Sequence, residues 1–114
     1  MIRAQSKKLR EFQSTKKGIK VQIELNNGNK MSVQASGSHY CTPRKDSVGM
    51  YSAVEIGFPS QRIELLMPYA EDKSCPTKTV YGWVPTSVLA QVIQESGGIK
   101  FATNKSFKMT NIDI

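Results

Sequence analysis

An Asn-Gly turn between two alternating apolar runs constrains the fold of this chain more than any other feature. Apolar and polar side chains alternate over residues 19–25 and again over residues 31–35, and Asn-Asn-Gly-Asn at residues 26–29 lies between the two runs. A period of two places the apolar side chains on one face of a strand. Asn-Gly favours the positive φ angles that a tight hairpin turn needs. The pattern predicts an antiparallel hairpin with one buried face.

Turn residues and proline divide the following stretch into short elements. Residues 51–58 and 79–84 are rich in β-branched and aromatic side chains and predict two further strands. Between them, Ser60 is a candidate cap for a short helix that ends at Pro68. After them, Thr86 is the candidate N-cap of a longer helix with apolar residues at helical spacing, closed by two glycines: Val88, Leu89, Val92, Ile93, Gly97 and Gly98.

These elements predict an α+β fold with a mostly antiparallel sheet, on which an N-terminal helix and a helix from the C-terminal half pack. The length of 114 residues is that of a single domain. Within it we expect a basic helix over residues 1–18, a core over residues 19–99, and a tail over residues 100–114 that could add an edge strand.

The net charge of +7 lies mainly at the N-terminus. Residues 1–20 contain seven basic and one acidic side chain, whereas residues 21–99 contain six basic and seven acidic ones. This distribution differs from the basic surface of many DNA-binding modules. For the basic helix we favour a dimerisation element with a solvated outer face, and a phosphate-backbone contact or a membrane-surface helix stays open.

No apolar stretch approaches the ~20 residues of a membrane span. The basic N-terminus lacks the apolar segment of a signal peptide, so we expect a cytoplasmic protein with two free thiols and no membrane contact. The single histidine, His39, lies two positions from Cys41, which separates same-face strand residues by about 7 Å. A buried thiol beside a loop histidine is the favoured interpretation.

Catalytic motifs are sparse. Neither a GxxxxGK[ST] nor a GxGxxG motif occurs, and the spacing of the two cysteines does not fit a zinc site. The acidic pair Glu71 and Asp72 is typical of a solvated loop. We therefore expect a binding protein that is not an enzyme and needs no cofactor or metal.

Residues 36–45 are the best candidate binding loop, because they combine hydroxyl side chains, an aromatic ring and two cations. Arg44 offers a planar fork for phosphate and Tyr40 a stacking surface for a base. The predicted ligand-binding residues are Arg44, Tyr40, Thr42, Arg62, Tyr69 and Trp83. Alternation predicts that Tyr81 and Trp83 share one face of their strand. A surface loop with a salt-bridged arginine, and a core or interface role for Trp83, stay open as alternatives.

Several unusual strings in residues 30–99 resemble the first-described Thoeris anti-defence family, phage sponges that sequester cyclic ADP-ribose signals made by TIR-domain proteins. The strings are Val-Gln-Ala-Ser at 33–36, His-Tyr-Cys-Thr-Pro-Arg at 39–44, Tyr-Ser-Ala-Val-Glu-Ile-Gly-Phe-Pro-Ser at 51–60, Pro-Tyr-Ala-Glu-Asp at 68–72, Thr-Val-Tyr-Gly-Trp-Val-Pro at 79–85 and Gly-Gly-Ile at 97–99.

The resemblance implies an α+β homo-oligomer that binds a cyclic ADP-ribose isomer tightly and does not cleave it, inside the host bacterial cell. It also implies that cyclic oligonucleotides are possible further ligands, as for some family members. The six binding residues come from side-chain chemistry and not from the family. A small basic phage protein that binds nucleic acid, and an inhibitor of a host protein, are the alternative functions.

Overall fold

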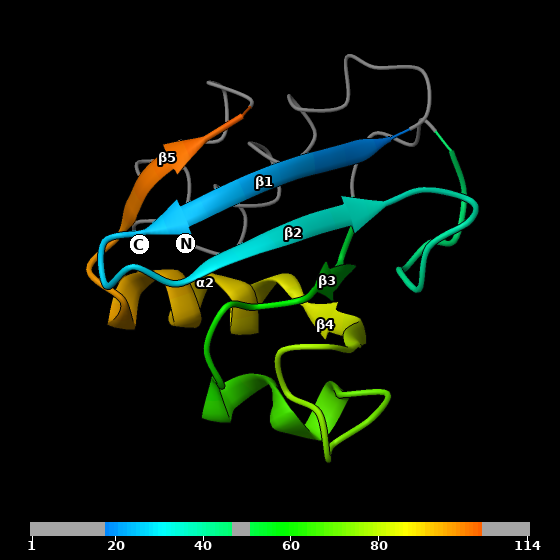
Figure 1. Ribbon diagram of the computed structural model, residues 1–114. Helices are drawn as coiled ribbons and strands as arrows, with labels where there is room; N and C mark the ends of the chain where they lie inside the picture. The colour runs from blue at the N-terminus through cyan, green and yellow to red at the C-terminus, as the bar shows by residue number, and fades with distance from the viewer. Residues whose placement is uncertain (1–17, 47–50, 104–114) are drawn as a thin grey trace.

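The predicted hairpin is the longest regular part of the computed structural model, which describes residues 18–46 and 51–103 (Figure 1). Strands β1 (Ile19–Leu25) and β2 (Lys30–Ala35) pair antiparallel without a break in register, from Ile19 opposite Ala35 to Glu24 opposite Lys30. In the turn, Gly28 has a φ of 93°, the left-handed conformation that glycine adopts readily. The prediction of a hairpin is confirmed.

Three more strands extend the hairpin into a five-stranded sheet with the order β4-β3-β2-β1-β5. They are β3 (Ala53–Gly57), β4 (Val80–Pro85) and β5 (Ile99–Ala102), and every neighbouring pair in the sheet is antiparallel. The predicted antiparallel sheet is confirmed. Strand β5 adds an edge to β1 and begins at Ile99, so the expected boundary between core and tail falls inside this strand.

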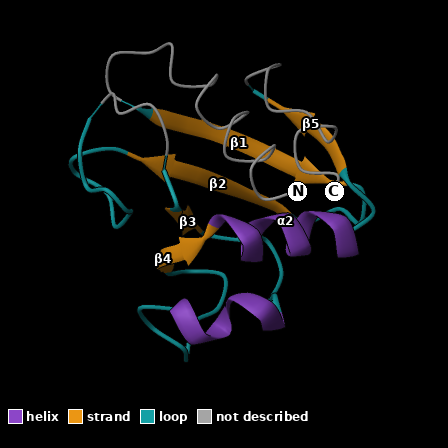
Figure 2. Ribbon diagram, turned by 180° about the vertical axis from the view of Figure 1, so that it is seen from behind, coloured by secondary structure: helices purple, strands orange, loops and turns teal. Residues whose placement is uncertain are grey.

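Helix α2 (Thr86–Glu95) lies along one face of the sheet, as both views show (Figures 1 and 2). The predicted helix packed on a sheet is confirmed, and the fold is α+β. Thr86 is the first helical residue and Pro85 occupies the N-cap position, so the prediction of Thr86 as N-cap is wrong. The Thr86 N–H donates to the Ser52 carbonyl instead, which ties the start of the helix to the sheet.

The core lies between α2 and the buried face of the sheet. Alternation along β1 and β2 buries every second side chain, and the apolar stripe of α2 covers them. The fully or almost fully buried apolar side chains are Ile19, Val21, Ile23, Leu25, Met31, Val33, Ala35, Cys41, Tyr51, Val54, Ile56, Leu66, Tyr81, Val84, Leu89, Val92 and Ile93.

The predicted short helix is a 3-10 helix, η2 (Glu64–Tyr69), which contacts β4 and α2. Ser60 does not cap it and Pro68 does not end it, since Pro68 lies inside the helix. The Ser60 hydroxyl is used elsewhere: it accepts the Lys30 N–H at 2.9 Å and contacts the Asn29 side chain at 3.1 Å. Both earlier predictions for this segment are therefore wrong.

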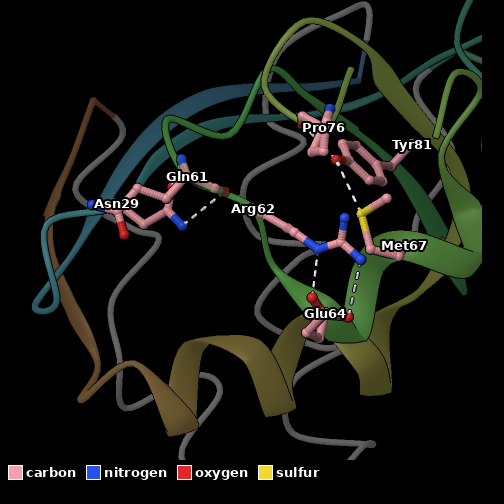
Figure 3. Close-up of polar contacts among 7 residues, drawn as sticks. All are labelled: Asn29, Gln61, Arg62, Glu64, Met67, Pro76 and Tyr81. Carbon is pink, nitrogen blue, oxygen red and sulfur yellow. Dashed lines mark hydrogen bonds and ion pairs between the residues drawn. The ribbon is translucent and has the colours of Figure 1, made fainter. Parts of the chain in front are cut away.

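Asn29 joins the hairpin turn to the segment that precedes η2 (Figure 3). Its side chain is almost completely buried, its Nδ2 donates to the Gln61 carbonyl at 3.2 Å, and its Oδ1 accepts the Gln61 N–H at 3.2 Å. A residue predicted only as part of a turn thus fixes a distant segment. The predicted basic helix over residues 1–18 lies, except for Gly18, outside the described residues, as do residues 104–114 of the predicted tail.

Candidate ligand-binding site

A bulge in β4 turns Trp83 out of the alternating pattern. Val54 pairs with Val84 and Ile56 pairs with Tyr81, so Gly82 and Trp83 together lie opposite the single residue Glu55. An extra residue of this kind reverses the facing of the residues beyond it. Tyr81 is fully buried whereas Trp83 is 50% exposed, and the prediction that the two share a face is wrong.

The conformation of Trp83 is unusual for a bulky residue. Its φ is 51°, a region that L side chains other than Asn and Asp rarely occupy. Backbone in this region costs on the order of 1–3 kcal/mol and is found most often at functional sites. The alternative that placed Trp83 in the core is wrong, because the residue is half exposed, and an interface role stays open.

The Tyr40 ring stacks on the exposed Trp83. The ring centroids are 4.8 Å apart with an interplanar angle of 22°, and the Trp83 N–H donates to the Tyr40 carbonyl at 2.9 Å. Gly82 allows this approach, since a Cβ at that position would lie 3.1 Å from the Tyr40 Cβ. The bulge therefore makes the stack possible in two ways. It turns the Trp83 indole outward, and it places Gly82 beside Tyr40.

Arg44 completes the arrangement. Its guanidinium carbon lies 5.2 Å from the centroid of the Tyr40 ring, within the range of a cation–π contact. Arg44 is exposed and forms no ion pair with any residue that the structure describes. Tyr40, Arg44 and Trp83 form one surface, which we call the aromatic–arginine cluster.

The loop that carries Tyr40 and Arg44 leaves the end of β2 and is held by bonds at both of its ends (teal to green in Figure 1). The Gly37 N–H donates to the Asp46 carboxylate at 2.7 Å and closes the loop on itself. Thr42 forms an isolated antiparallel bridge with Ala53, with its N–H 3.0 Å from the Ala53 carbonyl. The side chain of Thr42 is exposed, and its main chain pairs with β3.

The other two predicted binding residues lie on a different segment. Arg62 precedes η2 and is paired with Glu64 (Figure 3), and this ion pair lowers the pKa of the Glu64 carboxyl below its usual value. Tyr69 ends η2 and packs partly buried against the core. Among the described contacts, no hydrogen bond, ion pair or ring contact joins Arg62 or Tyr69 to the aromatic–arginine cluster.

His39 and Cys41 do not contact each other through their side chains in the described hydrogen bonds. His39 Nδ1 lies 2.6 Å from the Ser36 hydroxyl, and the buried Cys41 Sγ lies 3.1 Å from the Ser36 carbonyl. Burial raises the pKa of the Cys41 thiol above its usual value, which keeps the sulfur protonated at neutral pH. The interpretation of Cys41 as a buried thiol is confirmed, and neither cysteine is in a disulfide.

Acidic residues outside the cluster have local structural roles. The Asp72 carboxylate accepts bonds from the Ser74 N–H at 3.0 Å and the Ser74 hydroxyl at 2.6 Å, and these bonds lower the pKa of Asp72. In residues 18–46 and 51–103, no group of three or more His, Cys, Asp or Glu side chains is arranged to hold a metal ion.

Sequence reasoning missed one residue of the site, Glu55. Its Oε1 accepts the Tyr40 N–H at 2.9 Å, and only 9% of the residue is exposed. A single acidic residue inside an otherwise apolar strand, Ala-Val-Glu-Ile-Gly, was the available signal. It did not stand out because strands with one solvated face carry such residues routinely.

No known protein family, characterised protein or solved structure matches the chain. None of the helices in the described part of the chain is long and apolar enough to cross a membrane. The resemblance to the anti-Thoeris sponges therefore stays a prediction.

Proposed function

We propose that this chain binds a cyclic ADP-ribose-type nucleotide signal at the aromatic–arginine cluster and sequesters it without degrading it, as an immune-evasion protein of a phage. The observation that supports this most is the stack of Tyr40 on the exposed Trp83, with the Arg44 guanidinium over the tyrosine ring. An adenine stacks on exposed aromatic rings, and a guanidinium bonds a pyrophosphate through its planar fork. One surface thus offers partners for the two ends of such a ligand.

The strained conformation of Trp83 supports the same proposal. A positive φ and a half-exposed indole both reduce the stability of the folded chain, and Trp83 combines them. Glycine would remove both costs. Presentation of the ring to a ligand explains why tryptophan occupies this position.

The affinity that a sponge needs exceeds what one cluster supplies. Nanomolar binding corresponds to about −12 kcal/mol. A stacked base contributes about 1–3 kcal/mol and a bond to a charged group about 1.5–3 kcal/mol. We therefore propose that a second copy of the chain closes over the ligand, in agreement with the expected homo-oligomer.

Ligand capture tests the proposal directly. The purified protein is incubated with the cyclic ADP-ribose mixture made by a TIR-domain enzyme, separated from unbound material, and heat-denatured, and the released material is identified by mass spectrometry. We expect the intact signal. A changed product contradicts sequestration and indicates a reaction, and an empty protein favours nucleic acid or a host protein as the partner.

Calorimetry on two arginine variants then locates the site. Arg44→Ala should weaken binding by about 1.5–3 kcal/mol, because a charged hydrogen-bonding partner of the phosphates is lost. Arg62→Ala is the matched control, since Arg62 is held by Glu64, and its affinity should equal that of the wild type. An equal loss in both variants would mean that Arg62 also contacts the ligand, and no loss in Arg44→Ala would remove Arg44 from the site.

A further inference from the structure

The main chain of Tyr40 is held between two strands. Its N–H donates to Glu55 Oε1 on β3 at 2.9 Å, and its carbonyl accepts the Trp83 N–H on β4 at 2.9 Å. These bonds fix the peptide groups on both sides of the Tyr40 Cα. The position of the Tyr40 main chain sets the position of its ring, so the stack on Trp83 depends on these two hydrogen bonds.

A glutamate is energetically unfavourable at the buried position of Glu55. It is 9% exposed, and its neighbours in β3 are small or apolar and buried. No ion pair among the described residues contains Glu55, and its Oε2 takes part in no described hydrogen bond. A buried carboxylate without a cation destabilises a fold, so an apolar side chain at this position would make the folded chain more stable.

The position of Glu55 in the sheet explains what it does. Glu55 is the one residue of β3 that faces the two bulge residues, Gly82 and Trp83. Three features therefore occur at this one position of the sheet. The Trp83 indole turns outward, Gly82 leaves room for Tyr40, and Glu55 accepts the Tyr40 N–H. On its other side Glu55 pairs with Gln34 of β2, inside the regular part of the sheet.

We infer that Glu55 is a positioning residue, whose carboxylate holds the Tyr40 main chain so that the tyrosine ring stacks on Trp83 in the free protein. A site whose stack is formed before the ligand arrives loses less conformational entropy on binding. The relevance to affinity rests on the proposed function, whereas the positioning itself is a property of the chain without ligand.

Trp83 provides the readout, because it is the only tryptophan of the chain. Its fluorescence, excited where tyrosine does not absorb, and the tryptophan bands of the near-ultraviolet circular dichroism spectrum therefore report on the surroundings of this one indole. Tyr40→Leu gives the reference spectrum of an unstacked Trp83. Glu55→Leu removes the acceptor of the Tyr40 N–H, whereas Glu55→Gln keeps an acceptor oxygen on a side chain of the same shape.

We expect the spectrum of Glu55→Leu to match that of Tyr40→Leu, and the spectrum of Glu55→Gln to match that of the wild type. A wild-type spectrum in folded Glu55→Leu would overturn the inference. So would a Glu55→Gln spectrum like that of Tyr40→Leu, because the charge and not the hydrogen bond would then be responsible. Far-ultraviolet circular dichroism establishes that each variant is folded.

Hydrogen exchange in the unmodified protein keeps the inference testable if Glu55→Leu does not fold. The Tyr40 amide should exchange at least about tenfold more slowly than an unstructured peptide amide, because a bonded N–H must open first. An unprotected Tyr40 amide would overturn the assignment.

Titration with the cyclic ADP-ribose isomer separates this inference from the proposed function. Glu55→Leu should bind at least about tenfold more weakly than the wild type and Glu55→Gln within about twofold, since only the former loses preorganisation. A wild type that captures no nucleotide contradicts the proposed function, and the spectra still decide the positioning. Equal affinity of Glu55→Leu and wild type, with the stack lost, contradicts the role of Glu55 in binding.

Discussion

The β1–β2 pair and the β3–β4 pair are both antiparallel, but the first is regular and the second contains a bulge. The first keeps one register along its length and buries every second side chain. The second changes register at Glu55, and its bulge contains a residue with positive φ and an exposed indole. Regular pairing thus builds the core, and the irregular pairing builds the surface on which Tyr40 stacks.

The comparison shows that the energetically unfavourable features lie around the bulge and not in the hairpin. In the hairpin, turn conformation, alternation and burial all favour the same structure. Around the bulge, a strained Trp83 and a buried Glu55 both act against stability, and both contact Tyr40. Local conflicts of this kind are expected at functional sites.

Removal of a core side chain from the regular pair should have the largest effect. Ile23 is 2% exposed, so Ile23→Ala should lower the free energy of unfolding by about 3–4 kcal/mol through lost burial and a cavity. Urea denaturation measures it. Gln22→Ala is the control, because this exposed neighbour should change stability by less than about 0.5 kcal/mol. A loss below about 1 kcal/mol for Ile23→Ala would contradict the assignment of this face to the core.

The end of the hairpin should be sensitive to loss of a polar side chain. Asn29→Ala removes a buried side chain that bonds both the N–H and the carbonyl of Gln61, and should cost about 2 kcal/mol of stability. Thermal and urea unfolding give the value. Lys30→Ala changes an exposed adjacent side chain and should be nearly neutral. If the two variants were equally stable, Asn29 would be no more than a turn residue.

Two substitutions of Trp83 test the irregular pair. Trp83→Gly should be more stable than Trp83→Ala by about 1 kcal/mol, because glycine tolerates a φ of 51°. At Val80, in the same strand with ordinary backbone, the order should reverse, with glycine less stable than alanine by about 0.5–1 kcal/mol. The same order at both positions would show that Trp83 is not strained.

Both Trp83 variants should also fail to retain the nucleotide, since neither carries a ring on which a base stacks. Mass spectrometry of heat-released material, as for the wild type, detects the loss. Full retention by a folded Trp83→Ala would remove the indole from the site and weaken the contrast between the two strand pairs.

The smallest effect concerns the two thiols. Cys75 is exposed and should react rapidly with a disulfide reagent at pH 8, whereas Cys41 should react only on unfolding. Burial raises the folded-state pKa of Cys41, so its contribution to stability is present below the unfolded-state pKa, about 8.5, and is lost as pH rises above it. Cys75→Ser should abolish the rapid reaction, and a persistent rapid phase would show that the loop around Cys41 opens.

Local patterns predicted much of the fold. The hairpin, the antiparallel sheet and the helix after Pro85 follow from periodicity and turn residues that lie close together in the sequence. The failures came from contacts between distant segments. Ser60 bonds the main chain of Lys30 and therefore cannot cap η2, and the bulge in β4 reversed the expected facing of Trp83.

The residues of the candidate site were predicted one by one, and the contacts between them were not predicted. Side-chain chemistry selected Tyr40, Arg44 and Trp83, and the structure brings these three together. It pairs Arg62 with Glu64 instead, a contact between near neighbours that the sequence analysis did not weigh. Glu55 was missed because its value comes from a hydrogen bond to a distant loop.

The sequence by itself determined most of the strands and helices and which side chains became candidates for a ligand-binding site, because both depend on residue type and short spacings. The tertiary structure decided which of those side chains meet. Tyr40 and Trp83 are far apart along the chain, and their contact requires the β4 bulge, the open space at Gly82 and the carboxylate of Glu55 in one rung of the sheet. Pairing between distant strands sets this geometry, and no local pattern encodes the register at which a strand slips by one residue.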